Sequence, residues 1–310
     1  DITAFADASL GLNGNSALAA GIYALAKYDA VIVNGGDISA TAIAQANGSA
    51  QAFGLWVYGG ESAVIDNEGD IVVSASAEYG SATAVGIYAA SYGDAVVDND
   101  GTLSVTATNY ADARYDSAYA IGILAQGDDV AVENSGHISV AAYVYGAEWT
   151  LARATGIYTA SADSATIDNS GDIDVFVAND GDVGASRAYG IFAESGYAIN
   201  IDNSGDIDIA GTSGGSFYLN YYDGVYLAGD FHADGIRAES IYGDIIITNT
   251  GDITITNQNP NGGVAGGLRD GDRFNGIRAT TRVGDAVIAN AGDVTITGGE
   301  IAIGLSATTE

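Results

Sequence analysis

The strongest constraint on the fold is a short phrase that recurs along the whole chain. Residues 167–175 read IDNSGDIDV, residues 65–73 read IDNEGDIVV and residues 201–209 read IDNSGDIDI. The eight copies carry these asparagines, 32 to 46 residues apart: Asn34, Asn67, Asn99, Asn134, Asn169, Asn203, Asn249 and Asn290. A constant phrase separated by spacers of variable length indicates stacked structural units whose loops differ in length.

Within each unit the side chains alternate between apolar and polar, which is the period of a β-strand. After the turn of one copy, for example, Ile173 and Val175 are separated by Asp174. A second phrase, written GIYA at 21–24 and GLWV at 54–57, alternates with the first along the chain. Together the two phrases predict three short strands per unit, joined by Asn/Gly turns and one variable loop.

Strands that carry the same side chains stack best in parallel and in register, so each unit forms one turn of a coil. The sequence therefore predicts an all-β fold, a right-handed parallel β-helix (β-solenoid) of about nine coils with variable loops. We expect a single β-solenoid domain over residues 1–310, with larger loop insertions near 210–234 and 256–275. The eight asparagines then form a structural ladder inside one corner, where each amide can donate to and accept from its neighbours in the stack.

Composition restricts the classes of partner. The chain has 40 acidic and 9 basic residues and a formal net charge of −31, which argues against nucleic acid as a partner because phosphate binding needs clustered basic residues. Hydrophobic residues make up 47% of the chain, too many for a disordered acidic tail. No apolar run is long enough for a transmembrane helix, so we expect no membrane insertion. The absence of cysteine excludes a thiol mechanism and is compatible with an exported bacterial protein.

The alternation of a G-I-x-A strand with an [IV]-x-N-x-G-x-[IL] strand resembles the passenger domains of bacterial autotransporters, which are secreted right-handed β-helices. The resemblance covers nearly the whole chain and implies a secreted, extracellular protein at the bacterial cell surface. It does not select one function, because such passengers serve as adhesins, matrix proteins, enzymes and toxins. The carboxy-terminal translocator barrel of that family has no counterpart in these 310 residues.

Stacking turns a repeated residue into a row with about 4.8 Å between neighbours. The position after the turn glycine is acidic in most copies, and four of its members are Asp37, Asp70, Asp172 and Asp206. Carboxylates so close repel one another unless a cation lies between them. Two interpretations stay open: a calcium site that bridges neighbouring coils, and a solvated acidic face screened by salt.

A second row follows the Gly-Ile pair of the other phrase. Its aromatic members are Tyr23, Trp56, Tyr88, Tyr158 and Phe192. The row then changes to Arg237 and Arg278. If these side chains point outward, they form an aromatic ridge suited to stacking on sugars or to protein contacts. The alternative is that a variable loop folds over the ridge and buries it.

The sequence favours no catalytic residues. GTSGG at 211–215 matches the G-x-S-x-G pattern, but it lies between predicted strands and not in the strand–turn–helix that a nucleophile elbow requires. Aspartate recurs in every unit as part of the scaffold phrase, so no single pair of carboxylates stands out. We therefore predict that the protein is not an enzyme and needs no cofactor, with a polysaccharide-active enzyme as the remote alternative.

Two functions fit these features. The first is an extracellular structural β-solenoid that stacks head-to-tail with copies of itself into fibres or a surface matrix. It follows from the ends of the sequence, DITAFA and GLSATTE, which show no capping segment over the first and last strands. The alternative is a monomeric autotransporter-type adhesin. Its aromatic ridge and loops such as FYLNYYDGVY at 217–226 would bind glycans or cell-surface proteins.

Overall fold

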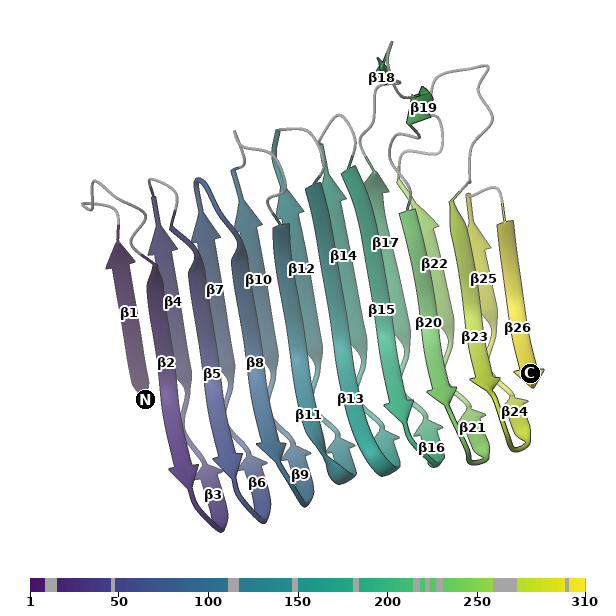
Figure 1. Cartoon of the computed structure of the whole chain (residues 1–310), viewed down its shortest axis with the longest axis horizontal. Helices are drawn as coiled ribbons and strands as arrows, with labels where there is room; N and C mark the ends of the chain where they lie inside the picture. The colour runs from purple at the N-terminus through teal and green to yellow at the C-terminus, as the bar shows by residue number, and fades with distance from the viewer. Residues whose placement is uncertain are drawn as a thin grey trace.

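The computed structural model describes residues 1–8, 16–45, 48–110, 117–146, 150–180, 184–213, 218–220, 224–226, 231–258, 272–298 and 301–309. Every helix or strand assigned within these residues is a strand. None of the described segments is a helix long and apolar enough to cross a membrane. The chain winds as an elongated stack whose long axis runs across the strands (Figure 1).

The first sheet has nine strands and follows the post-turn segments of the repeated phrase. In stacking order its strands are β1 (Ile2–Ala8), β4 (Ile38–Ala44), β7 (Ile71–Ala77), β10 (Leu103–Asn109), β12 (Ile138–Val144), β14 (Ile173–Asn179), β17 (Ile207–Ser213), β22 (Ile253–Asn257) and β25 (Val294–Thr297). All neighbours pair in parallel and in register, with Ile38 opposite Ile71 and Ile71 opposite Leu103. The equivalent residues of successive phrases therefore lie directly above one another.

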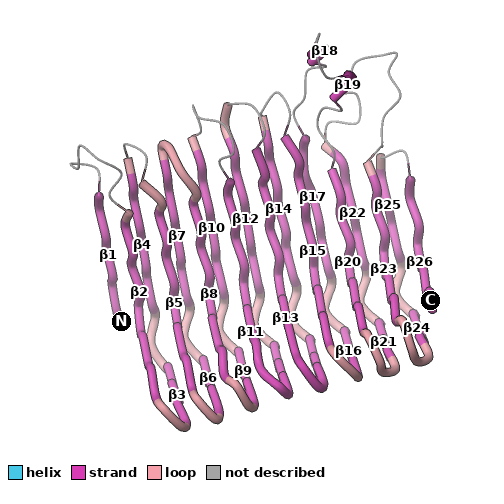
Figure 2. Tube along the Cα trace, viewed as in Figure 1, coloured by secondary structure: helices cyan, strands magenta, loops and turns pink. Residues whose placement is uncertain are grey.

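The second sheet carries the Gly-Ile phrase and the segments that lead into the turn. Its main row is β2 (Ala17–Ala26), β5 (Ala50–Gly59), β8 (Ala82–Ser91), β11 (Ser117–Asn134), β13 (Thr150–Asn169), β15 (Gly184–Ser195), β20 (Phe231–Ser240), β23 (Arg273–Thr281) and β26 (Ile301–Thr309). A side row holds β3 (Asp29–Asn34), β6 (Ser62–Asn67), β9 (Asp94–Asn99), β16 (Ala198–Asn203), β21 (Ile245–Asn249) and β24 (Ala286–Asn290). Figure 2 shows the strands of the two sheets running past one another, with short bends at the ends of each pass.

These parallel sheets confirm the predicted fold class, an all-β parallel β-helix. The expectation of three short strands in every coil is wrong in two coils, where the second and third strands are one continuous strand of 18 residues (β11) or 20 residues (β13). The backbone from Gly127 to Asp129 stays extended and absorbs the bend as a register irregularity. The predicted turn is therefore replaced by a β-bulge.

The core lies between the sheets and is made of small and β-branched side chains. Ile38, Ile71 and Leu103 stack in one fully buried row of the first sheet. Gly54 of the Gly-Ile phrase faces this row, and a Cβ atom there would lie 2.3 Å from Ile71 Cγ2 and 2.5 Å from the Gly86 carbonyl oxygen. Glycine is required at this position because the two sheets approach too closely for a side chain.

Parts of the predicted loop insertions near 210–234 and 256–275 fall outside the described residues, in the segments 214–217, 221–223, 227–230 and 259–271. Within the first insertion, β18 (Tyr218–Asn220) and β19 (Gly224–Tyr226) pair as a short antiparallel hairpin. Figure 1 places this hairpin beyond the ends of the stacked strands. It is therefore an addition to the stack and not a member of it.

Candidate binding face

The eight asparagines form one file along the inside of the corner. Each Nδ2 donates a hydrogen bond of 2.7–2.8 Å to Oδ1 of the next asparagine, from Asn34 through to Asn290. Each Nδ2 also donates to the carbonyl oxygen of the glycine two residues later, at 2.6–2.8 Å. Both amide hydrogens are thus used in a buried position, where an unsatisfied polar group would cost about 1–3 kcal/mol. The file is a structural support for the outer surfaces.

The aspartates after the turn glycine lie one above another on the outside of the same corner. Backbone N–H groups of Asp70, Thr102, Asp206 and Asp252 donate to the carboxylates of Asp37, Asp70, Asp172 and Asp206, respectively, at 2.8–3.3 Å. Across the described ranges, no group of three or more His, Asp or Glu side chains is arranged to hold a metal ion. The row therefore has a structural use that needs no cation: each carboxylate accepts an N–H group of the next coil.

The first half of the aromatic row lies on the outer face of β2, β5 and β8. Tyr23, Trp56 and Tyr88 are in register. The Trp56 ring packs edge-on against both neighbours, with centroids 5.0 Å from Tyr23 and 5.9 Å from Tyr88. Phe53 adds a fourth ring, 4.5 Å from Trp56 and 6.3 Å from Tyr88. Tyr23 is 53% exposed and the other three rings are partly exposed, so the ridge presents aromatic surface to solvent.

Further along the same row, the rings are covered by arginine. Tyr158 and Phe192 stack with centroids 5.2 Å apart, and Tyr189 lies 5.2 Å from Phe192. Phe192 is only 6% exposed, so the expectation of an exposed ring is wrong at this position. Its cover includes the guanidinium groups of Arg153 and Arg237, whose Cζ atoms lie 5.9 Å and 4.8 Å from the ring centroid. Both contacts have cation–π geometry.

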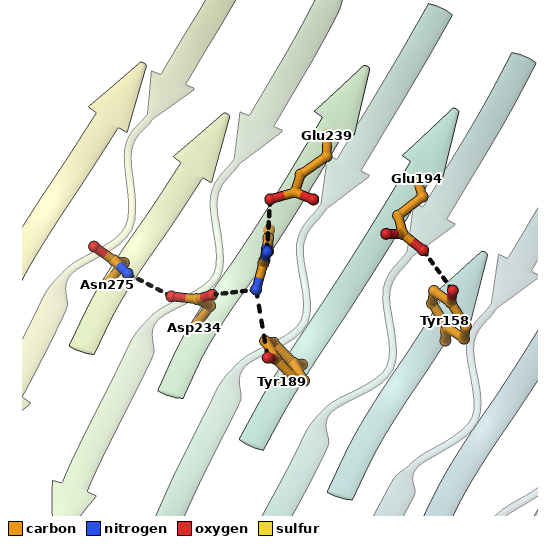
Figure 3. A network of polar contacts seen from close by, with 7 residues as sticks. Tyr158, Tyr189, Glu194, Asp234, Glu239 and Asn275 are labelled. Atoms are coloured by element: carbon orange, nitrogen blue, oxygen red, sulfur yellow. Dashed lines mark hydrogen bonds and ion pairs between the residues drawn. The ribbon is translucent and has the colours of Figure 1, made fainter. Parts of the chain in front are cut away.

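Figure 3 shows a polar network that includes Tyr189, Asp234 and Glu239. The guanidinium group of Arg237 joins these three side chains. Its Nη2 atom is 2.6 Å from Glu239 Oε1, and its Nη1 atom is 3.7 Å from Asp234 Oδ2. Nη1 also donates to the Tyr189 hydroxyl at 3.4 Å. On the other side of Asp234, Asn275 Nδ2 donates to its Oδ1 atom. The charge of Arg237 is therefore paired within the protein, most closely with Glu239.

Burial raises two pKa values in this region. The pKa of Asp234 is raised by burial, and the hydrogen bond from Asn275 and the charge of Arg237 only partly offset that effect. The pKa of Tyr158 is raised by burial and by the hydrogen bond that its hydroxyl donates to Glu194. The electrostatics of this half of the row thus include a largely buried carboxyl group, Asp234, and a half-buried hydroxyl group, Tyr158.

Beside the network lies a hollow of about 580 Å³. Its lining includes the acidic side chains Glu194 and Glu239, the basic side chains Arg278 and Arg282, and Thr280. The Oγ atom of Thr280 is buried and makes no hydrogen bond within the described residues. A hollow lined by both acidic and basic side chains can accommodate a polar ligand.

Sequence reasoning missed part of this surface. It followed only the residue after the Gly-Ile pair, but the residue before the pair, such as Phe53 or Tyr189, also packs against the aromatic row. It also missed Arg153, which lies three residues before its Gly-Ile pair. Both positions recur at fixed distances from the phrase, so reading every outward position in each copy would have found them.

Comparison with known proteins adds no relative. No protein-family model matches the chain, and no curated protein and no solved structure matches it significantly. The β-solenoid architecture is consistent with a β-helical passenger domain, and it rests on the strand pairing described above.

Proposed function

We propose that the protein is a structural β-solenoid of the secreted autotransporter-passenger type that acts as an adhesin, binding surface glycans through its aromatic ridge. The observation that carries the proposal is the contact row of Tyr23, Phe53, Trp56 and Tyr88, whose rings touch along three strands and remain partly exposed. Exposed contiguous apolar surface on a folded protein usually marks an interaction site.

The scaffold suits this role because it holds the rings at fixed spacing. Each ring is anchored on a strand paired in register on both sides, except Tyr23 on β2, for which one paired neighbour is described. Aromatic rings offer flat apolar faces that pack against the C–H faces of sugars, with hydroxyl or indole N–H groups at the edge for hydrogen bonds. A rigid platform also reduces the entropy lost when a ligand binds.

Binding to immobilised cell-surface polysaccharide tests the proposal. Trp56→Ala removes the central ring, and we expect a loss of about 30-fold in affinity, the size typical of an aromatic hot spot. Tyr88→Ala should act in the same direction with a smaller effect. Tyr110→Ala, which changes an exposed tyrosine directly after β10 of the first sheet, serves as the matched control and should leave binding unchanged. Thermal melts establish that each variant folds; equal binding by folded Trp56→Ala and the parent would refute the proposal.

A second proposal is association between copies through the outermost described coils. Among the described strands, β1 pairs only with β4 and β26 only with β23. The inward side chains Ile22, Ala24 and Ile296 are only partly buried there. A strand edge of this kind can pair with another parallel strand.

The open edge of β1 can be blocked without touching the stack. Ile2 N–H donates to Asp37 of the next coil, so alternation along the strand directs the Phe5 N–H toward the open edge. Phe5→Pro removes this donor, and we expect it to abolish any concentration-dependent association seen by sedimentation velocity. A parent chain that stays monomeric at millimolar concentration would contradict the second proposal and leave the first intact.

A further inference from the structure

The basic residues of this acidic chain gather on one face. Six of its nine Lys and Arg residues lie within β13, β15, β20 and β23 or directly after β23: Arg153, Arg187, Arg237, Arg273, Arg278 and Arg282. Each of them is at least partly exposed, on the same outer face as the aromatic row. In a chain with a net charge of −31, a cluster of this kind is a local positive surface on a negative protein.

The arginines are stacked in register. Arg153 lies opposite Arg187, Arg187 opposite His232, and His232 opposite Arg273. In the neighbouring row, Arg237 lies opposite Arg278. Like charges directly opposite one another on adjacent strands destabilise a sheet. Folding alone does not favour this arrangement, whereas a bound anion between the strands would stabilise it.

The protein supplies little counter-charge to this face. Among the described residues of this face, the ion pairs are those of Arg237 with Glu239 and Asp234. No such ion pair is recorded for Arg187, Arg273 or Arg278 within those same residues. In Arg153, the Nε atom is buried and has no hydrogen-bond partner within the described residues. The exposed guanidinium groups of Arg187 and Arg273 and the half-buried one of Arg278 can donate to a ligand, with the bidentate geometry that carboxylates accept.

The surroundings restrict the anion to a sugar acid. The buried rings of Tyr189 and Phe192 and the half-buried ring of Tyr158 lie under Arg153, and their cation–π contacts hold its guanidinium group in place. The adjoining hollow of about 580 Å³ offers Glu194 and Glu239 as acceptors for hydroxyl groups and Arg278 as a donor. These carboxylates and the large negative charge of the chain would repel a densely charged polyphosphate. A glycan with no more than one carboxylate per ring satisfies the arginines and tolerates the glutamates.

We propose that the outer face of β13, β15, β20 and β23 is a binding site for a carboxylate-bearing glycan, held by stacked arginines above an aromatic floor. The inference deepens the proposed function, because it names the ligand class for the arginine half of the same row. Four strands span three spacings of about 4.8 Å, or about 14 Å in total. The site therefore takes a short oligosaccharide segment lying along the stack axis.

The test compares two hexasaccharides of the same linkage, one with a carboxylate on each ring and one with a neutral hydroxymethyl group in its place. Isothermal titration with a β-1,4-linked mannuronate hexasaccharide should give binding that weakens as salt rises. Mannohexaose has the same linkage with hydroxymethyl groups in place of the carboxylates, and it should bind at least tenfold more weakly. Arg278→Gln and Arg187→Gln should each reduce the affinity for mannuronate about tenfold. The matched control Lys27→Gln removes the same charge from an exposed site at the end of β2 and should leave the affinity unchanged.

The outcomes separate this inference from the proposed function. Equal affinities for the two hexasaccharides, or unchanged mannuronate binding by folded Arg278→Gln and Arg187→Gln, overturn the carboxylate site. If Trp56→Ala still abolishes binding to cell-surface polysaccharide in that case, the ridge proposal stands alone. Conversely, arginine-dependent mannuronate binding together with unchanged binding of folded Trp56→Ala to cell-surface polysaccharide supports this site and removes the ridge. Tighter binding to a single-stranded oligonucleotide than to mannuronate would identify a phosphate site and also overturn the inference.

Discussion

The coils of β2, β5 and β8 and the coils of β15, β20 and β23 share the repeated features of their interior but differ in their exteriors. Both halves contain the asparagine file, the buried isoleucine row and the Gly-Ile phrase. Outside, one half shows partly exposed rings at Tyr23, Trp56 and Tyr88, whereas the other carries Arg237 and Arg278 at the same position in the coil. The difference teaches that stacking restricts inward residues strongly and outward residues weakly. The chemistry of the outer surface can therefore change along one scaffold.

The largest effect should come from breaking the interior that both halves share. Asn67→Ala and Asn203→Ala each remove a donor and an acceptor from a buried file and leave the neighbouring amides unsatisfied. We expect each to lower the free energy of unfolding by about 3 kcal/mol, measured by urea denaturation. Asn290→Ala, at a partly exposed position of the file, should cost about 1 kcal/mol. Costs that differ strongly between Asn67 and Asn203 would show that the two interiors are not equivalent.

A somewhat smaller effect should follow from overpacking the Gly-Ile phrase in either half. A Cβ atom on Gly190 would lie 2.5 Å from Ile207 Cγ2 and 2.5 Å from the Gly235 carbonyl oxygen, close to the values at Gly54. Gly54→Ala and Gly190→Ala should each destabilise the fold by about 2 kcal/mol. Gly304→Ala is the control, because no atom lies within 4 Å of the added carbon among the contacts described. If Gly304→Ala cost as much as the other two, close packing of the sheets would not be the cause.

The half that contains Asp234 should show a pH-dependent contribution to stability. Because the pKa of Asp234 is raised in the folded state, its contribution to stability is complete below the unfolded value and is lost as the pH rises through the folded value. Asp234→Asn removes this titration. The difference in melting temperature between Asp234→Asn and the parent should therefore shift in favour of the variant as the pH rises from 3 toward neutrality. A difference that is constant with pH would contradict the burial of this carboxylate.

The smallest expected effect on stability comes from removing a single tyrosine hydroxyl group in each half. Tyr158 donates to Glu194, and its pKa is raised by burial, so Tyr158→Phe should lower the free energy of unfolding by about 1 kcal/mol. Tyr23 is 53% exposed, and Tyr23→Phe should change it by less than about 0.5 kcal/mol. Thermal denaturation at neutral pH measures both. Equal effects would mean that the arginine half is no more ordered by polar contacts than the aromatic half.

The interior of the fold could be predicted because one phrase carries several constraints at once. Alternation in the phrase places Ile173 inward, and the repeated asparagine and glycine define the corner, so the parallel stack and its register follow from pattern alone. The continuous strands β11 and β13 could not be predicted. Whether the chain turns or bulges near Gly127 depends on how the neighbouring coil pairs with it.

The outer face was harder to predict because contacts between rows decide it. The sequence identifies Phe192 as a member of the aromatic row, but its burial depends on Arg153 and Arg237, which reach its ring from other strands. Similarly, the sequence left two interpretations of the acidic row of Asp37 and Asp70 open, because its hydrogen bonds to backbone N–H groups of the next coil are invisible in the pattern. The sequence pattern predicts where a residue lies in its coil, but it does not predict which side chains that residue contacts.

The central claim is that equivalent residues of successive coils lie directly opposite one another. Because the chain contains no cysteine, engineered pairs report on this without background. Ser104 and Ser139 are paired in register on β10 and β12, so their Cα atoms are close enough for a disulfide, whereas Ser104 and Ala141 are offset by two residues. After mild oxidation, mass spectrometry should show a disulfide in Ser104→Cys/Ser139→Cys and free thiols in Ser104→Cys/Ala141→Cys. Equal or reversed cross-linking would contradict the in-register stack.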